Sequence, residues 1–390
     1  MKTRRMWVWI SLCVVGLVGL IVLGLVGLML YGFFEVRKFE RLTDTRDLRQ
    51  RTGQLAEGYL AKRSAGALVV GLVQQDKLFT AGFGRVSAAN AVAPGATTIF
   101  EIGSITKVFT GIALAKMVTD GTLRLEDTIE RSLPPGGELP LALRPVTLVQ
   151  LATHTAGLPR LPENLHLSDA RADNPYIRYG SKELYEYLRT AKLSHAPGRK
   201  SDYSNLGAGL LGHILELRAG KSYEQLVRES ICEPLGMPDT TITLSAAQRE
   251  RLTPGHDPAG QVVPNWDFAV LAPAGALRSC VGDLLKLVQA SVATNHPTLG
   301  RALAFAQQPH FKSWIETVGL GWQIQETTEG LCFCWHNGGT GGYVSFLGFD
   351  PKHQTGIVLL SNYGDAMGGD DTLDKMGMEL LKLAVKISWE

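Results

Sequence analysis

An apolar run near the N-terminus is the strongest hydrophobic pattern in the chain. Met6 to Phe34 are 29 residues without a charge, preceded by Lys2, Arg4 and Arg5. A helix needs about 20 apolar residues to cross a bilayer. A cleaved signal peptide would have a shorter apolar core followed by a small-x-small site, and this run has neither. We therefore predict that residues 1–34 form a short tail and a retained signal anchor, with residues 6–34 in the lipid bilayer.

A charged segment follows this predicted anchor. Residues 35–51 carry ten charges of mixed sign in seventeen positions and contain no Pro or Gly. This pattern is typical of a solvated helical stalk or a plain spacer. Basic residues lie on both sides of the anchor, so the positive-inside rule does not settle its orientation. The glycines of the anchor recur every eight residues, which indicates either a face for a homo-oligomer or the usual abundance of glycine in membrane helices.

Short β-prone segments occupy both ends of residues 52–390. The first two, 65–73 and 77–83, are separated by polar residues and predict a hairpin. Further strands are expected at 97–102, 319–325, 332–336, 343–349 and 356–360, with a closing helix over 372–387. This order predicts one sheet built from both ends of the chain. The sheet lobe would comprise residues 52–121 and 301–390.

The middle of the chain has a helical pattern. Ser104 to Val118 follows a predicted strand directly, has the spacing of an amphipathic helix and ends at Asp120-Gly121. Other helical segments are expected at 147–153, 181–191, 206–219, 223–231 and 281–294. Residues 122–300 would thus form a helical lobe inserted between the two parts of the sheet. A long polar loop over 158–180 interrupts it, and loops of that length are often functional or mobile.

Composition and charge exclude several classes of protein. The 390 residues are 45% hydrophobic and 19% charged, as in a packed globular protein. Residues 42–390 carry 33 basic and 35 acidic residues, which does not suit nucleic acid as a partner. Five cysteines in a chain of this length do not make a disulfide framework, and their pairing cannot be read from the sequence.

The junction between strand and helix at Gly103-Ser104 carries the first candidate chemistry. Ser104 and Lys107 are three residues apart, so a helix places the hydroxyl and the amine on one face. Such a pair can act as nucleophile and proton acceptor if burial or nearby cations depress the pKa of the lysine. The alternative is that Ser104 caps the helix and Lys107 is a solvated surface residue.

Two further groups of polar residues lie on predicted loops. Tyr203 and Asn205 precede a helix, where a tyrosine near a lysine can act as base and an asparagine can bind a substrate amide. The alternative is a buried Tyr203 with Asn205 as helix cap. Residues 335–343 end a strand with His336-Asn337 and a glycine run, whose backbone N–H groups can bind an oxyanion. The alternative there is a flexible hairpin loop.

A metal site on the same strand is disfavoured. Cys332, Cys334 and His336 alternate and therefore face one side of the strand. Three ligands on one strand rarely close a tetrahedron, and no fourth ligand is indicated nearby. We therefore expect no metal.

Together these motifs resemble the penicillin-recognising serine hydrolases, which include class C β-lactamases, DD-carboxypeptidases and family VIII esterases. The motifs are Phe100-Glu101-Ile102-Gly103-Ser104-Ile105-Thr106-Lys107, Leu151-Ala152-Thr153-His154-Thr155-Ala156-Gly157-Leu158-Pro159, Tyr203-Ser204-Asn205 and His336-Asn337-Gly338-Gly339. Pro234-Leu235-Gly236-Met237 and Pro273-Ala274-Gly275-Ala276 also match, so the resemblance covers roughly residues 45–388. It implies an α/β (α+β) fold, in which an antiparallel sheet is flanked by N- and C-terminal helices around the inserted helical lobe.

The resemblance also implies roles for individual residues. Ser104 would be acylated, Lys107 would share a proton with Tyr203, and Tyr203 would assist acylation and proton delivery. Asn205, His336, Gly338, Gly339 and Thr340 would bind substrate. The backbone N–H groups of Ser104 and Gly339 would form the oxyanion hole. No metal or organic cofactor would be needed, and the substrate would be a small molecule or a peptide.

One residue departs from the family pattern. His336 stands where β-lactamases and many DD-peptidases carry a lysine that holds the substrate carboxylate. An imidazole is mostly neutral at pH 7, so the anchoring of a carboxylate would be weaker or pH-dependent. Histidine here is similar to esterase, aminopeptidase and amidase members, which puts β-lactam hydrolysis in doubt.

The resemblance predicts a single-pass protein whose catalytic domain lies outside the cytoplasmic membrane. Its substrate would be a D-alanyl peptide, a D-amino acid amide, a small ester or a β-lactam. The alternative is a non-catalytic penicillin sensor or an interaction scaffold. We expect an enzyme, because a scaffold should have lost one of the four reactive residues and five residues before the anchor leave no room for a cytoplasmic output domain.

Overall fold

The computed structural model describes residues 48–63, 66–87, 91–134, 139–165, 174–364 and 372–389. The predicted anchor over residues 6–34 lies outside these ranges. Among the helices within them, none combines the length and apolar character that a membrane span requires.

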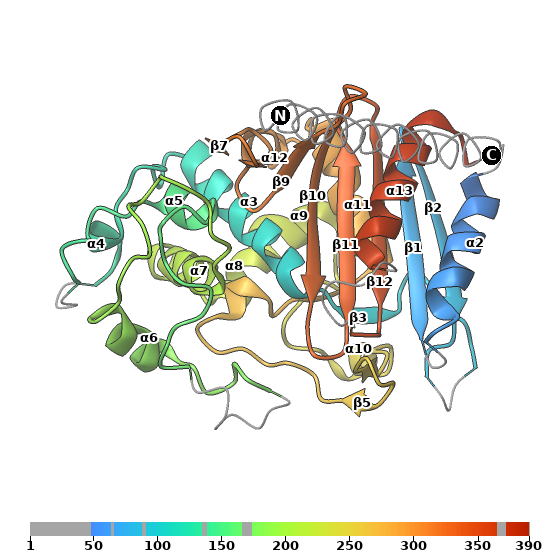
Figure 1. Cartoon of the computed structure of the whole chain (residues 1–390), viewed down its shortest axis with the longest axis horizontal. Coiled ribbons are helices and arrows are strands. Elements are labelled where there is room, and N and C mark those ends of the chain that lie inside the picture. The colour runs from blue at the N-terminus through green and yellow to red at the C-terminus, as the bar shows by residue number, and fades with distance from the viewer. Residues whose placement is uncertain are drawn as a thin grey trace, which may run out of the picture.

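An eight-stranded sheet is the centre of the fold (Figure 1). Its strands are ordered β2-β1-β12-β11-β10-β9-β8-β7, and every neighbouring pair is antiparallel. They span β1 (Ala67–Gln74), β2 (Lys77–Gly84), β7 (Phe311–Lys312), β8 (Thr317–Val318), β9 (Gln323–Glu326), β10 (Cys332–Gly339), β11 (Val344–Asp350) and β12 (Thr355–Ser361). The predictions of an initial hairpin and of one antiparallel sheet built from both chain ends are confirmed, except for the strand expected at 97–102. That strand, β3 (Ile99–Glu101), pairs instead with β6 (Arg278–Cys280) in a separate two-stranded sheet.

Helices cover both faces of this sheet. On one face, α2 (Leu48–Leu60) and the closing helix α13 (Leu373–Lys386) bury a cluster that includes Leu359 and Leu380. On the other face, α11 (Val281–Ala293) packs against β1 and β12, in the larger of the two main cores (Figure 1). These strands are therefore covered on both faces, which explains why β1 and β12 are buried along almost their whole length rather than at alternate residues.

Helix α2 begins at Leu48. The sequence predicted the boundary between the charged segment and the folded domain at residue 52, which is four residues later. Leu48, Thr52, Ala56 and Tyr59 are buried at helical spacing, so the helix has a core-facing side despite its charged neighbours. Its arginine Arg51 pairs with Glu379 of α13 at 2.6 Å. The helix therefore belongs to the packed part of the protein.

A helical lobe lies to one side of the sheet, at the left of Figure 1. It includes α4 (Ile129–Ser132), α5 (Leu148–Ala152), α6 (Ser181–Leu188), α7 (Asn205–Ala219) and α8 (Tyr223–Val227). The chain then continues through η2 (Arg228–Cys232) to α9 (Glu233–Leu235), which contacts α11. The remaining elements are β3 (Ile99–Glu101), η1 (Gly103–Ile105), α3 (Thr106–Thr119), α10 (Ala246–Arg249), β4 (Gly255–His256), β5 (Val262–Val263), η3 (Ala272–Ala274), β6 (Arg278–Cys280) and α12 (Gly300–Ala306). A helical insert is present, but the predicted range of 122–300 is too wide, because α11 packs on the sheet and β4, β5 and β6 also lie within that range.

Helix α3 lies between the sheet lobe and the helical lobe. The sequence predicts a helix here with one apolar face, and the helix is present. Its burial is different: every residue from Thr106 to Ala115 is buried, because α7, α12 and η3 all pack against it. Lys107 is therefore enclosed, which the spacing of apolar residues did not indicate.

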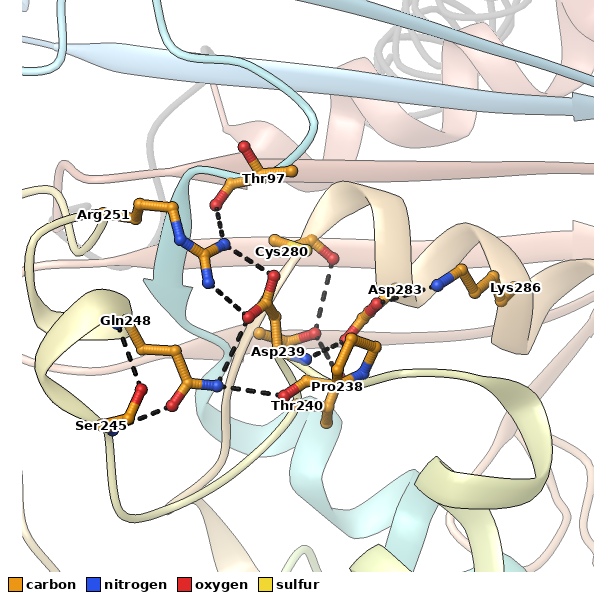
Figure 2. Close-up of polar contacts among 11 residues, drawn as sticks. Thr97, Pro238, Asp239, Thr240, Ser245, Gln248, Arg251, Cys280, Asp283 and Lys286 are labelled. Carbon is orange, nitrogen blue, oxygen red and sulfur yellow. Dashed lines mark hydrogen bonds and ion pairs between the residues drawn. The ribbon is translucent and has the colours of Figure 1, made fainter.

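A polar network fixes the segment that leads into β3 (Figure 2). Arg251 makes a two-pronged ion pair with Asp239, at 2.5 and 2.6 Å, and donates to the carbonyl oxygen of Thr97 at 2.9 Å. The backbone N–H of Asp239 donates to Asp283 at the start of α11, and Lys286 pairs with that carboxylate. The network ties the chain just before β3 to the helix that packs on the sheet.

Candidate active site

Ser104 lies in the short turn between β3 and α3. The strand β3 pairs with β6, and the chain then turns sharply at Gly103, whose φ is +49°. A Cβ atom on Gly103 would lie 2.6 Å from the backbone nitrogen of Gly339, so only glycine fits this close approach. The half-buried Ser104 is thereby held beside the end of β10, and its side chain makes no capping hydrogen bond to the helix. The helix-cap alternative for Ser104 is therefore wrong.

Lys107 reaches back to Ser104 from the first turn of α3. Its Nζ lies 3.0 Å from the Oγ of Ser104 and 2.6 Å from the carbonyl oxygen of Ala274 in η3. The side chain is only 2% exposed, so the alternative of a solvated surface lysine is wrong. The segment that supplies the Ala274 carbonyl is itself bound to α3, because the hydroxyl of Thr110 donates to the carbonyl oxygen of Pro273.

The protonation of Lys107 follows from this enclosure. Burial lowers the pKa of Lys107 well below its usual value, and the nearby positive charge of Arg160 lowers it further. A lowered pKa increases the population of the neutral amine at a given pH, and a neutral amine can accept the proton of Ser104.

Tyr203 lies beside this pair, on the loop before α7. The Nζ of Lys107 is 4.8 Å from the centre of its ring. Burial raises the pKa of Tyr203 to about 12, although a hydrogen bond with Ser104 and the charge of Arg160 both lower it. The neutral phenol is therefore the resting form, which is a proton donor rather than the base expected from the sequence. Between the two residues, Lys107 is the group able to accept a proton.

Asn205 is the first residue of α7 and lies next to Tyr203. The helix cap is Ser204, whose Oγ accepts the N–H of Gly207 at 2.9 Å, so the cap alternative for Asn205 is wrong. The side chain of Asn205 makes a hydrogen bond with Tyr176. Its Oδ1 is buried without a hydrogen-bond partner among the described residues, which leaves an acceptor for a substrate N–H group.

His336 lies in the middle of β10 and faces the same site. It is 2% exposed, and its ring centre is 6.2 Å from that of Tyr203. Its Nδ1 lies 2.5 Å from the carbonyl oxygen of Asn337, so the neutral ring carries its proton on Nδ1. Burial lowers the pKa of His336 to about 4, and the charge of Lys107 contributes. The imidazole is therefore neutral at pH 7.

The glycines at the end of β10 contribute backbone groups, rather than side chains, to the site. A Cβ atom on Gly338 would lie 2.0 Å from the carbonyl oxygen of Ile102, whereas the exposed Gly339 has space around it. The β10 strand continues through Gly339 and pairs with β11, so the flexible-loop alternative is wrong for these residues. Thr340 has its Oγ1 buried near the carboxyl group of Glu101, which turns the hydroxyl toward the protein interior.

His154, from one of the motifs that carry the family resemblance, holds the loop that bears Tyr203. Its Nδ1 accepts the N–H of Ser204 at 3.2 Å, and its carbonyl oxygen accepts the N–H of Asp202 at 2.9 Å. Its ring contacts that of Tyr203, with the centres 4.6 Å apart. The backbone of His154 has a φ of +60°, which is uncommon outside glycine and indicates a constrained turn.

An aromatic cluster lies behind Asn205. Tyr176, from the loop over 158–180, stacks on Phe268 with ring centres 4.5 Å apart and meets the ring of Trp266 edge-on at 5.3 Å. Gly341, just after β10, packs against Trp266, because a Cβ atom there would lie 2.8 Å from the indole nitrogen. The long loop thus contributes an apolar wall beside the polar groups. Sequence reasoning did not identify Trp266 or Phe268, which no motif marks.

Within the residues that the structure describes, no group of three or more His, Cys, Asp and Glu side chains could hold a metal ion. Cys232, Cys280, Cys332 and Cys334 are free thiols.

Comparison with known proteins decides which family carries this arrangement. Residues 52–376 match the family described as Beta-lactamase. The chain belongs to this family. The predicted membership and the prediction of an enzyme are confirmed: the chain is a serine hydrolase of the β-lactamase-like type, and a non-catalytic sensor or scaffold is not favoured.

Individual relatives agree with this assignment. D-alanyl-D-alanine-carboxypeptidase/endopeptidase AmpH of Escherichia coli K12 is 32% identical over 295 residues, which cover 71% of this chain and 74% of AmpH. A β-lactamase of Pseudomonas fluorescens is 26% identical over 358 residues, 81% of this chain and 94% of that protein. The crystal structure of a β-lactamase/D-alanine carboxypeptidase from Pseudomonas syringae superimposes with a TM-score of 0.76 at 21% identity. It covers 86% of this chain and 99% of that one, which confirms the α+β fold.

Proposed function

We propose that this protein is a membrane-anchored hydrolase that forms an acyl-enzyme on Ser104. The observation that carries the proposal is the buried amine of Lys107 at 3.0 Å from the Ser104 hydroxyl oxygen. This geometry satisfies the requirement that a serine nucleophile has a base within hydrogen-bond distance.

In the first step, the Oγ of Ser104 attacks the carbonyl carbon of an amide or ester while its proton passes to the Nζ of Lys107. Negative charge develops on the carbonyl oxygen and would be stabilised by the backbone N–H groups of Ser104 and Gly339. The two residues are well placed for this role, because the Gly103 backbone packs directly on that of Gly339.

Collapse of the intermediate breaks the bond to the leaving group, which must receive a proton. The phenol of Tyr203, which is neutral at rest, delivers this proton to the leaving group. The ammonium group of Lys107 then reprotonates Tyr203. In the second step water attacks the ester on Ser104, the same groups remove its proton, and the acid product and free serine are released. The buried Oδ1 of Asn205 would accept an N–H group of the substrate.

We infer that the preferred substrates are peptides ending in D-alanyl-D-alanine. Support comes from the relative AmpH, whose name describes this carboxypeptidase activity. Small esters and D-amino acid amides are the second candidate, favoured by the neutral His336. A β-lactam is the weakest candidate for the same reason. Residues 6–34 would hold the enzyme at the cytoplasmic membrane with its catalytic domain outside, where such peptides are found.

The test is intact-protein mass spectrometry of the full chain in detergent, mixed with a penicillin or with an activated acetyl ester. We expect a covalent mass gain in the native protein and in Ser181→Ala, an exposed control position at the start of α6, and none in Ser104→Ala. A gain with penicillin and its decay rate would separate peptidase from β-lactamase, whereas a gain with the ester alone would favour the esterase. Equal labelling of Ser104→Ala would contradict the proposal.

A further inference from the structure

Arg160 lies at the mouth of the site and has no role in the mechanism described above. Its backbone is fixed, because its carbonyl oxygen accepts the N–H groups of Asn205 at 2.9 Å and Leu206 at 3.3 Å. The preceding residue, Pro159, accepts the hydroxyl of Ser204 at 2.6 Å. The backbone of Arg160 is therefore bound to the start of α7, next to the loop that carries Tyr203.

The side chain of Arg160 is exposed and lies over the ring of Tyr203, with its guanidinium carbon 5.1 Å from the ring centre. Among the described residues, no carboxylate or carbonyl oxygen forms an ion pair or a hydrogen bond with this guanidinium. Its charge nevertheless reaches into the site, where it lowers the pKa of both Lys107 and Tyr203. An arginine stacked on a site tyrosine without an anionic partner is available to an anion that enters from solvent.

The other basic groups around Tyr203 cannot take this role. Lys107 is buried and already contacts the Ser104 hydroxyl and the Ala274 carbonyl oxygen. His154 and His336 are buried and neutral, because enclosure lowers the pKa of the first to about 3 and of the second to about 4. Arg160 is thus the permanently charged and exposed group next to Tyr203 within the described part of the chain.

We propose that Arg160 binds a carboxylate of the substrate and supplies the fixed positive charge that His336 does not. The planar guanidinium can donate two parallel hydrogen bonds to a carboxylate, which a single imidazole cannot do. Asn205 would bind the substrate amide on one side of Tyr203 while Arg160 holds the anionic end. This inference rests on the proposed acyl-enzyme function, and it specifies substrates that carry a carboxylate.

The test compares matched substrates on the full chain in detergent. One member of the pair is an N-acetylated peptide ending in D-alanyl-D-alanine with a free carboxylate, and the other has the same sequence with a C-terminal carboxamide. The neutral ester p-nitrophenyl acetate reports the serine chemistry alone. The variants are Arg160→Gln, Arg160→Lys and the control Arg189→Gln, an exposed arginine at the end of α6. All rates are measured at the pH plateau of each variant.

We expect Arg160→Gln to lower kcat/KM for the carboxylate peptide about 10- to 100-fold, mainly through KM, since hydrogen bonds to charged groups contribute about 1.5–3 kcal/mol. The carboxamide and the ester should change by less than about threefold, Arg160→Lys should recover part of the loss, and Arg189→Gln should behave as the native protein. Among the described residues, Arg160 is held through its carbonyl oxygen, which accepts the N–H groups of Asn205 and Leu206. The side-chain variants should therefore keep the fold, which circular dichroism would verify.

Three results would overturn the inference. The loss could be equal on all three substrates, which would indicate an effect on Lys107 rather than binding of an anion. The preference for the carboxylate peptide could persist in Arg160→Gln. The native protein could turn over the ester but not the carboxylate peptide, which would leave the acyl-enzyme proposal intact. If the native protein shows no Ser104-dependent turnover of any substrate, the proposed function fails together with this inference.

Discussion

The Nζ of Lys107 lies 3.0 Å from the Oγ of Ser104, with the lysine side chain almost fully enclosed. The two residues are one helical turn apart, so their proximity is a local property of the chain. The enclosure is not local, because the groups around the amine come from η3 and from the helical lobe. Together the two effects place a nucleophile beside an amine whose pKa is lowered, so that it can act as a base.

Replacing this base should abolish acylation. Lys107→Ala removes the proton acceptor, and Lys107→Arg retains a charge that cannot be lost, so both should lower the acylation rate at least about 1,000-fold. The pre-steady-state burst with p-nitrophenyl acetate measures this rate. Lys116→Ala, in the last turn of the same helix, is the matched control and should keep the burst. A burst of native size in Lys107→Arg would contradict the role of a neutral amine.

The pH dependence of the native enzyme should report the same group. The pKa of Lys107 is lowered well below 10.5, so the neutral amine is populated at lower pH than in an exposed lysine. The acylation rate should therefore rise with pH through this lowered pKa and reach a plateau below pH 10.5. Arg160→Gln removes a neighbouring positive charge and should move the rise to higher pH. A rise that is absent, or unmoved in that variant, would count against this assignment.

Tyr203→Phe should slow acylation without abolishing it. The phenol, whose pKa of about 12 keeps it protonated, delivers a proton, and such a transfer typically contributes about 100- to 10,000-fold. The ring that contacts His154 remains in the variant, so thermal stability should change little. The measurement is the acylation rate beside the melting temperature, with Tyr185→Phe as a control at a tyrosine that bonds His213 instead. Loss of activity accompanied by a large loss of stability would point to a structural role only.

His154 should act by positioning Tyr203. His154→Ala removes the acceptor for the Ser204 N–H group and places alanine at a φ of +60°, so stability should fall by about 1–3 kcal/mol and kcat should fall more than KM rises. His154→Asn should recover much of both, since asparagine tolerates this backbone conformation and its side-chain oxygen can accept the same hydrogen bond. Urea unfolding and steady-state kinetics test this, and equal losses in the two variants would disprove it.

His336→Lys should strengthen the binding of substrates that carry a carboxylate. The native imidazole, with a pKa lowered to about 4, is neutral at pH 7, whereas a lysine at this position of β10 would offer a cation. In the Arg160→Gln background the same change should restore part of the lost affinity. The measurement is the inhibition constant of a non-reactive carboxylate ligand, against its carboxamide as control. Unchanged or weakened binding would argue against this hypothesis.

The ion pair between Arg251 and Asp239 should contribute to stability in a pH-dependent way. The hydrogen bonds from Arg251 hold the pKa of Asp239 below 3.8, so the contribution is present above the unfolded pKa and is lost as the pH falls through the folded one. Arg251→Gln should therefore lower the free energy of unfolding by roughly 1–2 kcal/mol at pH 7, with the difference shrinking below pH 3.8. Urea titrations beside the exposed control Arg249→Gln measure this, and a difference that is independent of pH would refute the mechanism.

The sequence predicted most of the fold because the relevant signals are local. Alternating or continuous apolar runs marked β1, β2, β11 and β12, and glycine marked the end of α3. The complete burial of the first ten residues of α3 was not predictable from its own sequence, because it depends on which elements pack on each side of the helix. The start of α2 was missed for the same reason, since its buried residues stand among many charges.

Part of the candidate site could also be predicted from the sequence. The spacing of Ser104 and Lys107, the Tyr203-Ser204-Asn205 segment and the glycines after His336 each follow from short stretches of chain. Most residues that surround these reactive groups could not be predicted from the sequence. Arg160 and Trp266 meet the site only through contacts between distant segments, and a single sequence contains no direct record of such contacts. His154 lies in a motif that the resemblance identified, but its contact with Tyr203 did not follow from that motif.

The sequence by itself thus determined the identities and order of the reactive groups and the one-turn distance between Ser104 and Lys107. The tertiary structure decided their chemical state. Enclosure by η3 and the helical lobe lowers the pKa of Lys107 and of His336 and raises that of Tyr203. The physical reason is that spacing along a helix is fixed by local backbone geometry, whereas the cost of a buried charge depends on every segment that excludes water from it.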